Sequence, residues 1–192
     1  MFDFDGTLTR RDTLFAFLFF AKGFLPALGV VLKCSPWLVL ALLFPALRST
    51  AKERLLAAAF KGWPQARLVD KGVAFCKKRL PGLLRPGGMA AIRQHRTNGH
   101  LCALVTASMD WWTAPFAAEQ GLTLISTQGE VAGGVFTGKF AGPNCIGPEK
   151  VTRIRAVIDP ERFERVIAYG DSNGDKAMLA LAQEAHYKPF RT

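Results

Sequence analysis

Short apolar runs alternate with helical patterns through the second half of the sequence, and this alternation limits the fold more than any other feature. Runs typical of buried strands occur at residues 101–106, 122–127 and 166–169, and a last edge strand is predicted at 186–190. Helical patterns occupy residues 110–120, 148–158 and 173–182, and Gly121 marks the end of the first. Residues 129–142 are glycine-rich and predict a β-hairpin that turns at Gly133-Gly134. Strands that alternate with helices form parallel sheets, so the sequence predicts an α/β fold.

The first half of the sequence is helical and strongly apolar. Residues 14–47 are rich in Leu, Phe, Val and Ala, and prolines, Gly29 and lysines interrupt the pattern. The longest charge-free stretch, residues 34–47, has 14 residues, fewer than the roughly 20 that cross a bilayer. This length favours a buried, re-entrant or interfacial helix over a membrane-spanning one. A further helix is expected at residues 49–60, with Leu55, Leu56 and Ala59 on its apolar side.

The positive charge is concentrated in this helical half. The chain carries a net charge of +10, and residues 10–85 hold fourteen Lys and Arg against three acids. Such a lobe suits either the ordinary solvated faces of a helical domain or an anionic partner such as a lipid surface or a charged substrate. Nucleic acid is not expected, because no recognised nucleic-acid-binding motif accompanies the charge.

The cysteines and the first residues of the sequence indicate the cellular compartment of the protein. Cys34, Cys76, Cys102 and Cys145 are far apart in the sequence and form no C-x-x-C pair, which is typical of a reduced protein. The sequence begins Met1-Phe-Asp, which does not resemble a signal peptide. A cytoplasmic protein is therefore expected, with attachment to the inner face of the membrane as an open alternative.

A pair of carboxylates stands at the start of the sequence, in Asp3-Phe-Asp-Gly-Thr-Leu-Thr9. In extended backbone, Asp3 and Asp5 project to the same side. Gly6 and Thr7 favour a tight turn whose N–H groups can hold an anion, and both are candidate substrate-binding residues. One carboxylate can attack phosphorus while its neighbour exchanges protons with the leaving group and water. Two such charges favour a hard cation between them, and Mg²⁺ suits oxygen ligands.

A second acidic motif, Gly170-Asp-Ser-Asn-Gly-Asp175, follows the strand predicted at residues 166–169. The carboxyl ends of parallel strands are where open α/β sheets bind ligands. Taken alone, a loop of this composition is weak support for a site, because Asx turns are common. Together with Asp3 and Asp5, it supplies the further carboxylates, Asp171 and Asp175, that such a site lacks.

With these motifs in place, the chain resembles phosphatases of the haloacid dehalogenase superfamily. The likeness is strongest to subfamily IB, the branch with phosphoserine phosphatase and phosphatidylglycerophosphatase C. Four signatures occur in the family's order and span nearly the whole chain. They are the motif at Asp3, the strand end Leu104-Val-Thr106-Ala-Ser108, the lysine in Gly147-Pro-Glu-Lys150, and the motif at Asp171. The resemblance implies a Rossmann-like parallel-sheet core, residues 1–11 and 87–192, with an inserted C1-type helical cap, residues 12–86.

The resemblance also implies a role for each motif residue. Asp3 matches the nucleophile and a Mg²⁺ ligand, and Asp5 matches the general acid/base, whose backbone carbonyl also binds the metal. Thr106 matches the phosphate-binding hydroxyl, and Ser108 would assist it or cap the following helix. Lys150 matches the cation that neutralises Asp3 and the phosphoryl group. Asp171 and Asp175 match the remaining metal-site carboxylates. The implied reaction is Mg²⁺-dependent hydrolysis of a phosphomonoester through an aspartyl-phosphate.

The sequence departs from the family at its first strand, because only Met1 and Phe2 precede Asp3. We expect the central strand to be truncated, with its backbone partners left unpaired. The favoured explanation is a native start upstream of Met1.

The substrate stays open at this stage. In phosphoserine phosphatases a glutamate after the first motif and an arginine in the cap bind the substrate, and here Asp12 and Arg54, or Lys52, would take these places. A small soluble phosphomonoester is favoured. A lipid phosphate such as phosphatidylglycerophosphate is the alternative, because the apolar segment lies in a basic lobe. A catalytically silent binding protein on the same fold is a further alternative, although the complete set of motif residues speaks against it.

Overall fold

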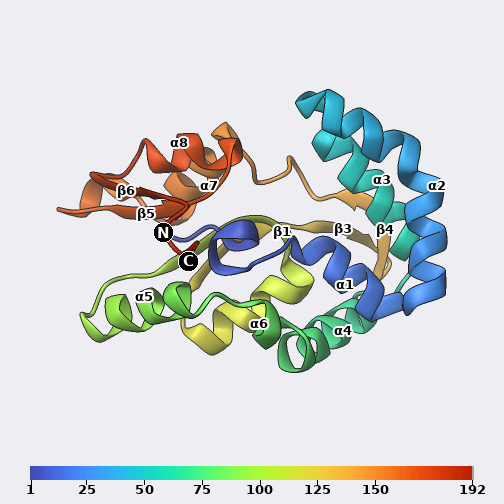
Figure 1. Cartoon of the computed structure of the whole chain (residues 1–192), viewed down its shortest axis with the longest axis horizontal. Coiled ribbons are helices and arrows are strands. Elements are labelled where there is room, and N and C mark those ends of the chain that lie inside the picture. The colour runs from blue at the N-terminus through green and yellow to red at the C-terminus, as the bar shows by residue number, and fades with distance from the viewer. Residues whose placement is uncertain (192) are drawn as a thin grey trace.

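The computed structural model describes residues 1–191 and contains two layers of helices around a parallel sheet (Figure 1). The helices are α1 (Thr13–Lys22), α2 (Phe24–Leu43), α3 (Arg48–Phe60), α4 (Gln65–Lys78), α5 (Pro86–Thr97), α6 (Asp110–Gln120), α7 (Pro148–Val157) and α8 (Lys176–Leu179). The strands are β1 (Ala103–Met109), β2 (Thr123–Thr127), β3 (Gly129–Ala132), β4 (Val135–Phe140), β5 (Ile167–Gly170) and β6 (Glu184–Tyr187). Short 3₁₀ turns lie at Pro45–Leu47, Leu80–Leu83, Pro160–Arg162 and Asn173–Asp175.

The first three residues form the central element of the sheet. Phe2 pairs in parallel with Leu104 of β1 on one side and with Tyr169 of β5 on the other. Its N–H donates to the Ala103 carbonyl at 2.8 Å, and the Asp3 N–H donates to the Tyr169 carbonyl at 2.9 Å. β2 extends the sheet beyond β1 and β6 extends it beyond β5, both in parallel. The expected unpaired partners are therefore not found here, because this short segment bonds to both neighbours.

Alternation along the strands divides the core between two layers. Ala103 and Val105 face a cluster under α7 and α8 that includes Ile154 and Met178. Leu104 faces the larger cluster on the side of α5 and α6 (Figure 1). Burial on both faces explains why β1 reads as a continuous apolar run in the sequence. The predicted fold class, a Rossmann-like α/β core with inserted helices, is confirmed.

Most predicted elements are found close to their expected bounds. α6 ends where Gly121 takes a left-handed conformation, φ 63°, which ends a helix without the strain that a side chain would add. Gly133 and Gly134 both have positive φ at the hairpin turn. The last helix is shorter than predicted and ends at Leu179, and the last strand begins earlier, at Glu184.

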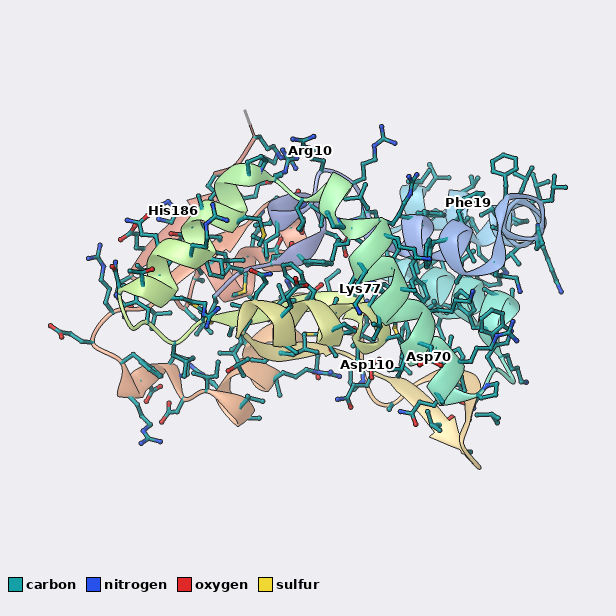
Figure 2. The ribbon with its side chains drawn as sticks, turned by 90° about the horizontal axis from the view of Figure 1, so that it is seen from below. Arg10, Phe19, Asp70, Lys77, Asp110 and His186 are labelled. Atoms are coloured by element: carbon teal, nitrogen blue, oxygen red, sulfur yellow. The ribbon has the colours of Figure 1, made fainter. Side chains whose placement is uncertain are left out.

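The helices α1 to α4 lie together at one end of the molecule, with the β3–β4 hairpin against them (Figure 1). The Gly62 N–H donates to the Phe136 carbonyl at 2.8 Å, and the Phe136 N–H donates to the Trp63 carbonyl at 2.9 Å. α4 also packs closely on α6, because a Cβ at Gly72 would lie 1.7 Å from the Trp111 carbonyl oxygen. Figure 2 shows Phe19 at this end of the long axis and His186 at the opposite end.

α2 differs most from the prediction. Instead of breaking near its prolines, residues 24–43 form one helix that continues through Pro36. By length and composition alone, this helix is long and apolar enough to cross a membrane. Only 17% of its most apolar 18-residue stretch is buried inside the protein. Of the buried, re-entrant and interfacial alternatives that the sequence left open, a buried helix does not describe most of these side chains.

Candidate active site

A cavity of about 200 Å³ opens at the carboxyl ends of the central segment, β1 and β5. Its lining brings together residues from all four sequence motifs. The sequence-predicted residues that line it are Asp3, Asp5, Asp12, Thr106, Ser108, Lys150 and Asp175. Parallel strands end at the same edge of a sheet, so motifs far apart in the sequence meet there.

Lys150 and Asp175 are the two most deeply buried charged residues of the cavity lining, and Lys150 joins the carboxylates together. It is 1% exposed, and its Nζ donates to Asp3 Oδ1 at 2.7 Å, to Asp175 Oδ1 at 2.6 Å and to the Val105 carbonyl at 2.8 Å. Three acceptors satisfy all three ammonium protons, which makes burial of the charge tolerable. Lys150 therefore fixes the orientation of the Asp3 carboxylate.

Burial and charge move the pKa values of these groups in different directions. Burial raises the pKa of Asp3 to about 7, although Lys150 opposes the rise. Burial would lower the pKa of Lys150, but the two adjacent carboxylates outweigh it and raise the pKa above its usual range. Burial also acts to raise the pKa of Asp175, yet Lys150 and Ser172 hold it below its usual value. Lys150 and Asp175 therefore stay charged together, while Asp3 is sensitive to any further cation beside it.

Asp3, Asp171 and Asp175 form an acidic cluster. One oxygen from each carboxylate lies within 4.8 Å of the others. Asp171 lies so close to the first motif that a Cβ at Gly6 would be 2.3 Å from its Oδ2. Arg191 also donates to Asp171 Oδ2. Three carboxylates at this spacing are the donor set that a hard divalent cation takes.

Asp5 lies outside this cluster and is held by a buried chain of hydrogen bonds. Its Oδ1 accepts from the Thr13 N–H at 2.7 Å, and its Oδ2 accepts from the Ser108 hydroxyl at 2.5 Å. The Ser108 and Thr13 hydroxyls are 3.2 Å apart, and Trp112 Nε1 donates to Thr13 Oγ1 at 2.9 Å. This chain holds the Asp5 carboxylate at the cavity wall.

Thr106 and Ser108 lie near the end of β1. The Thr106 Oγ1 accepts from the Ser108 N–H at 2.9 Å, and both side chains are almost fully buried. The bond closes a small turn at the strand end and directs both residues into the cavity lining. Ser108 thus contacts the Asp5 carboxylate, in addition to lining the cavity.

The helical half contributes Asp12 and Lys52 to the cavity. Asp12 caps α1 by accepting from the Leu14 N–H at 2.8 Å. Burial, with the nearby charge of Asp5, raises the pKa of Asp12 to about 6. Burial lowers the pKa of Lys52 to about 8, although Asp5 and Asp12 oppose the shift. Lys52 is held by bonds to the Ala107 carbonyl and, at 3.2 Å, to Asn144 Oδ1.

Arg54 does not line the cavity. It is exposed on α3, and its guanidinium lies 3.8 Å from the centre of the Trp37 ring. Two residues along an α-helix turn by roughly 200°, so Lys52 and Arg54 cannot share one face. Of the two cations that the sequence offered for this place, the structure brings Lys52 to the cavity.

Gly6 and Thr7 support the first motif from behind the cavity. Gly6 has a φ of 82°, as the predicted turn requires. Its N–H donates to Thr9 Oγ1 at 3.3 Å, so it is not free for an anion as expected. Thr7 is 1% exposed, and its hydroxyl has no partner among the described residues.

Three residues with clear roles in the geometry were missed by the sequence analysis. Thr13 and Trp112 belong to the chain that holds Asp5. Asn144 accepts from Lys52 and from the Thr127 hydroxyl at 2.8 Å, and it donates to the Ser49 hydroxyl at 3.1 Å. The only sequence signal was that Thr13 follows Asp12 at a helix start. Trp112 and Asn144 enter through tertiary contacts that no local pattern indicates.

Comparison with known proteins places these observations in a family. The model of the haloacid dehalogenase-like hydrolase family matches residues 1–180. Protein CicA of Caulobacter vibrioides (strain NA1000 / CB15N) is 38% identical over 197 residues, covering 99% of this chain and 85% of CicA.

Solved structures agree on the fold. A protein of unknown function from Bordetella pertussis Tohama I superposes with a TM-score of 0.79 at 25% identity, covering 94% of this chain and 85% of that one. A substrate-bound phosphoserine phosphatase superposes with a TM-score of 0.66 at 17% identity, covering 94% and 80%. At this identity the second likeness concerns the fold alone.

Proposed function

Since the chain belongs to the haloacid dehalogenase-like hydrolase family, we propose that it is a Mg²⁺-dependent phosphatase that forms an aspartyl-phosphate on Asp3. The predicted recognition and the assignment as an enzyme of this superfamily are confirmed. The observation that carries the proposal is the buried Lys150, whose ammonium group joins Asp3 and Asp175 at the ends of neighbouring strands. A lysine in this position neutralises charge at the point where a phosphoryl group would be transferred.

The reaction has two steps in this proposal. A carboxylate oxygen of Asp3 attacks phosphorus, the bond to the leaving oxygen breaks, and the Asp5 carboxyl group gives its proton to that oxygen. Asp5 then removes a proton from water, which attacks the phosphorus and breaks the bond to Asp3. Inorganic phosphate leaves, and Asp3 and Asp5 regain their starting forms. Ser108 and Thr13 hold Asp5 in place for both proton transfers.

The acidic cluster fits a magnesium ion by its donor chemistry. Asp3, Asp171 and Asp175 would hold the ion, since their carboxylate oxygens lie within 4.8 Å of one another. Bound there, Mg²⁺ would supply the positive charge that keeps Asp3 ionised and offsets the charge of the phosphoryl group. Lys150 already supplies one positive charge to Asp3. In this proposal the negative charge of Asp3 and of the phosphoryl group is neutralised by two cations, the fixed Lys150 and an exchangeable Mg²⁺.

The substrate in this proposal is a small phosphorylated metabolite. A cavity of about 200 Å³ accommodates a phosphoryl group and a small leaving group. Lys52 and Asp12 stand on the side of the helical half, where they would contact the leaving group. The division into a core of residues 1–11 and 87–192 and a cap of residues 12–86 belongs to the same proposal, because α1 and α3 contribute these two side chains beside the strand ends.

The test is phosphate release from p-nitrophenyl phosphate, phosphoserine, sugar phosphates and phosphatidylglycerophosphate, with and without Mg²⁺. We expect turnover that requires Mg²⁺ and is lost with excess chelator. A single turnover in ¹⁸O-labelled water should place the label in the released inorganic phosphate, because the proposed second step is attack of water on the phosphorus of the aspartyl-phosphate. Folded protein that releases no phosphate from any of these compounds would favour the silent binding protein instead.

The label in ¹⁸O experiments distinguishes the point of attack. If water attacks phosphorus, as proposed, the label enters inorganic phosphate, and over many turnovers it does not accumulate in Asp3. The aspartyl-phosphate itself is then detected by trapping with borohydride, which reduces the acyl phosphate at Asp3 and is read by mass spectrometry of the peptide. Trapping at a residue other than Asp3 would contradict the proposed nucleophile.

The ionisation of Lys52 should make the activity of the enzyme depend on pH. Its lowered pKa, about 8, means that the ammonium form is lost as the pH rises through this value. We expect kcat/KM for an anionic substrate to fall above pH 8, because this parameter reports the ionisation of the free enzyme. Lys52→Arg should move the fall to higher pH, since a guanidinium stays charged. Lys61→Arg, at an exposed position of the same region, is the control, and an unchanged profile in Lys52→Arg would exclude the role of Lys52.

A lipid phosphate is a second candidate substrate because an apolar groove adjoins the cavity. The groove shares Asp12, Leu14 and Lys52 with the cavity and continues along Phe15 and Leu38. An acyl chain or another apolar group attached to the phosphate would find apolar lining there. Preference for phosphatidylglycerophosphate in the panel above would favour this candidate, and preference for the soluble compounds would exclude it.

A further inference from the structure

In helix α2 the small side chains face the protein and the large apolar side chains face outward, which is the reverse of a typical helix in a soluble protein. The side chains that it buries are small, Ala27, Cys34 and Ala41, at intervals of seven residues. Large apolar side chains point outward instead, and Leu25 and Leu42 are 76% and 78% exposed. Small residues on the packed side let two helices approach closely, which is a feature of helices whose other side faces lipid.

The exposed side chains form one continuous face. At about 100° per residue, Leu25, Leu32 and Val39 fall on the side opposite the buried seam, and they are exposed by 76%, 64% and 54%. The exposed large apolar residues of this helix and its end are Phe24, Leu25, Leu28, Leu32, Val39, Leu40, Leu42, Leu43 and Phe44. Helix α2 has 20 residues, so the face extends for roughly 30 Å. Soluble monomers rarely expose a contiguous apolar face of this length.

The opposite side of α2 is fixed lengthwise to α3. Cys34 Sγ contacts the Arg54 carbonyl at 3.9 Å, the Arg54 guanidinium stacks on Trp37, and Arg48 Nε donates to the Ala41 carbonyl at 3.4 Å. Figure 1 shows α2 along the outer edge of the molecule, with α3 on its inner side. A helix held in this way along its length presents its outward face sideways, which suits lying in a membrane surface rather than crossing it.

The charges around α2 identify the kind of surface that it fits. Residues 13–52 contain no Asp or Glu and four cations, Lys22, Lys33, Arg48 and Lys52. Lys33 is exposed on the flank of the apolar face, and Arg48 is exposed just beyond the end of α2. Positive charge at the edges of an apolar face complements the headgroups of anionic lipids. A protein partner usually offers and requires hydrogen bonds, and the side chains of this face provide almost none.

We propose that the outward face of α2 docks on the surface of an anionic lipid bilayer. The apolar groove beside the catalytic cavity begins at this helix, where Leu38, Ala41 and Leu42 line it. Of the residues on the outward face, only Leu42 also lines the groove, so the groove adjoins the docking face at this residue. The docking itself does not depend on the proposed phosphatase activity.

The test is flotation with vesicles of phosphatidylcholine containing phosphatidylglycerol, compared with phosphatidylcholine alone. The wild-type chain is expected to float with the anionic vesicles and less with the neutral ones. The variant Leu32→Glu/Val39→Glu should lower the bound fraction by about tenfold or more, because two carboxylates on the docking face oppose both insertion and the anionic surface. The control is Val69→Glu/Val157→Glu, which adds the same charges at exposed valines on α4 and α7 and should bind as wild type.

Three results would overturn the proposal. The first is wild-type protein that stays unbound to anionic vesicles at low salt, and the second is equal loss of binding in both double variants. The third is a wild-type dimer in light scattering that Leu32→Glu/Val39→Glu dissociates, because a second copy would then cover the face. Activity on p-nitrophenyl phosphate is measured in parallel. Inactive protein that floats would contradict the proposed function and support docking, and active protein that does not float would do the reverse.

Discussion

Asp3→Asn is expected to lower the rate of phosphate release by about 10⁴-fold or more, because an amide cannot replace the carboxylate that attacks phosphorus. The substitution keeps the shape of the side chain, and Lys150 keeps its bonds to Asp175 and to the Val105 carbonyl. The folded structure should therefore survive the loss of charge at Asp3. The measurement is Mg²⁺-dependent turnover of p-nitrophenyl phosphate, with thermal unfolding recorded for each protein.

Asp70→Asn is the matched control for this experiment. Asp70 is exposed on α4 (Figure 2), so the same chemical change there should leave turnover within about twofold of wild type. A folded Asp3→Asn protein that keeps a tenth or more of wild-type turnover would exclude Asp3 as the nucleophile. In that case Asp5 or Asp171 would be the next carboxylate to test.

Lys150→Met is expected to abolish turnover and to destabilise the fold by about 3–5 kcal/mol, because it leaves buried carboxylates without their cation. Methionine has the same length as the aliphatic part of the lysine side chain, so the loss is mainly one of charge and hydrogen bonds rather than of packing. The destabilisation should depend on pH. Removing the cation raises the pKa values of Asp3 and Asp175 in the folded state. At neutral and higher pH both carboxyl groups are ionised in the unfolded state, so the variant loses most stability there. The difference from wild type then narrows as the pH falls, since a protonated carboxyl group needs no cation.

Urea unfolding at pH 7.5 and pH 5.5 measures this effect. Lys176→Met is the control, because Lys176 is exposed at the start of α8 and its charge should contribute little. Adding Mg²⁺ to Lys150→Met should restore part of the stability, since a cation bound by Asp3, Asp171 and Asp175 would replace some of the missing charge. A stability loss below 1 kcal/mol at pH 7.5 would contradict the role given to the buried ion pairs.

The membrane proposal and the catalytic proposal meet at Lys52. This residue lines both the catalytic cavity and the apolar groove, and it belongs to the acid-free segment around α2. A phosphate with an apolar tail would contact Lys52 with its charged end and the groove with its tail. The substrate panel and the flotation experiment therefore give separate answers about one continuous surface.

Several elements were predictable because their signals are local. Gly121 ends α6 where predicted, because glycine takes the left-handed conformation without strain. The pair Gly133-Gly134 fixes the hairpin turn by the same property. The order of Asp3, Thr106, Lys150 and Asp171 along the chain was sufficient to identify the family, and the cavity contains the first three of them.

The helices of the first half of the chain were predicted less well, because apolar residues occur on more than one side of them. In residues 24–43, the pattern does not show which face packs against the protein, and Pro26 and Pro36 suggested breaks that the helix does not have. Lys52 and Arg54 are both cationic side chains, and they lie two residues apart in the sequence near the expected place. Only the rotation of α3 determines which one reaches the cavity.

The sequence by itself determined the α/β class, the family and the candidate residues for the chemistry, because strand periodicity, turn glycines and motif order are properties of short segments. The tertiary structure alone decided three further points. It placed Lys150 between Asp3 and Asp175, it joined Trp112, Thr13 and Ser108 into a support for Asp5, and it turned the large side chains of α2 outward. These depend on how distant elements pack against one another, and packing is a property of the whole chain that no local pattern contains.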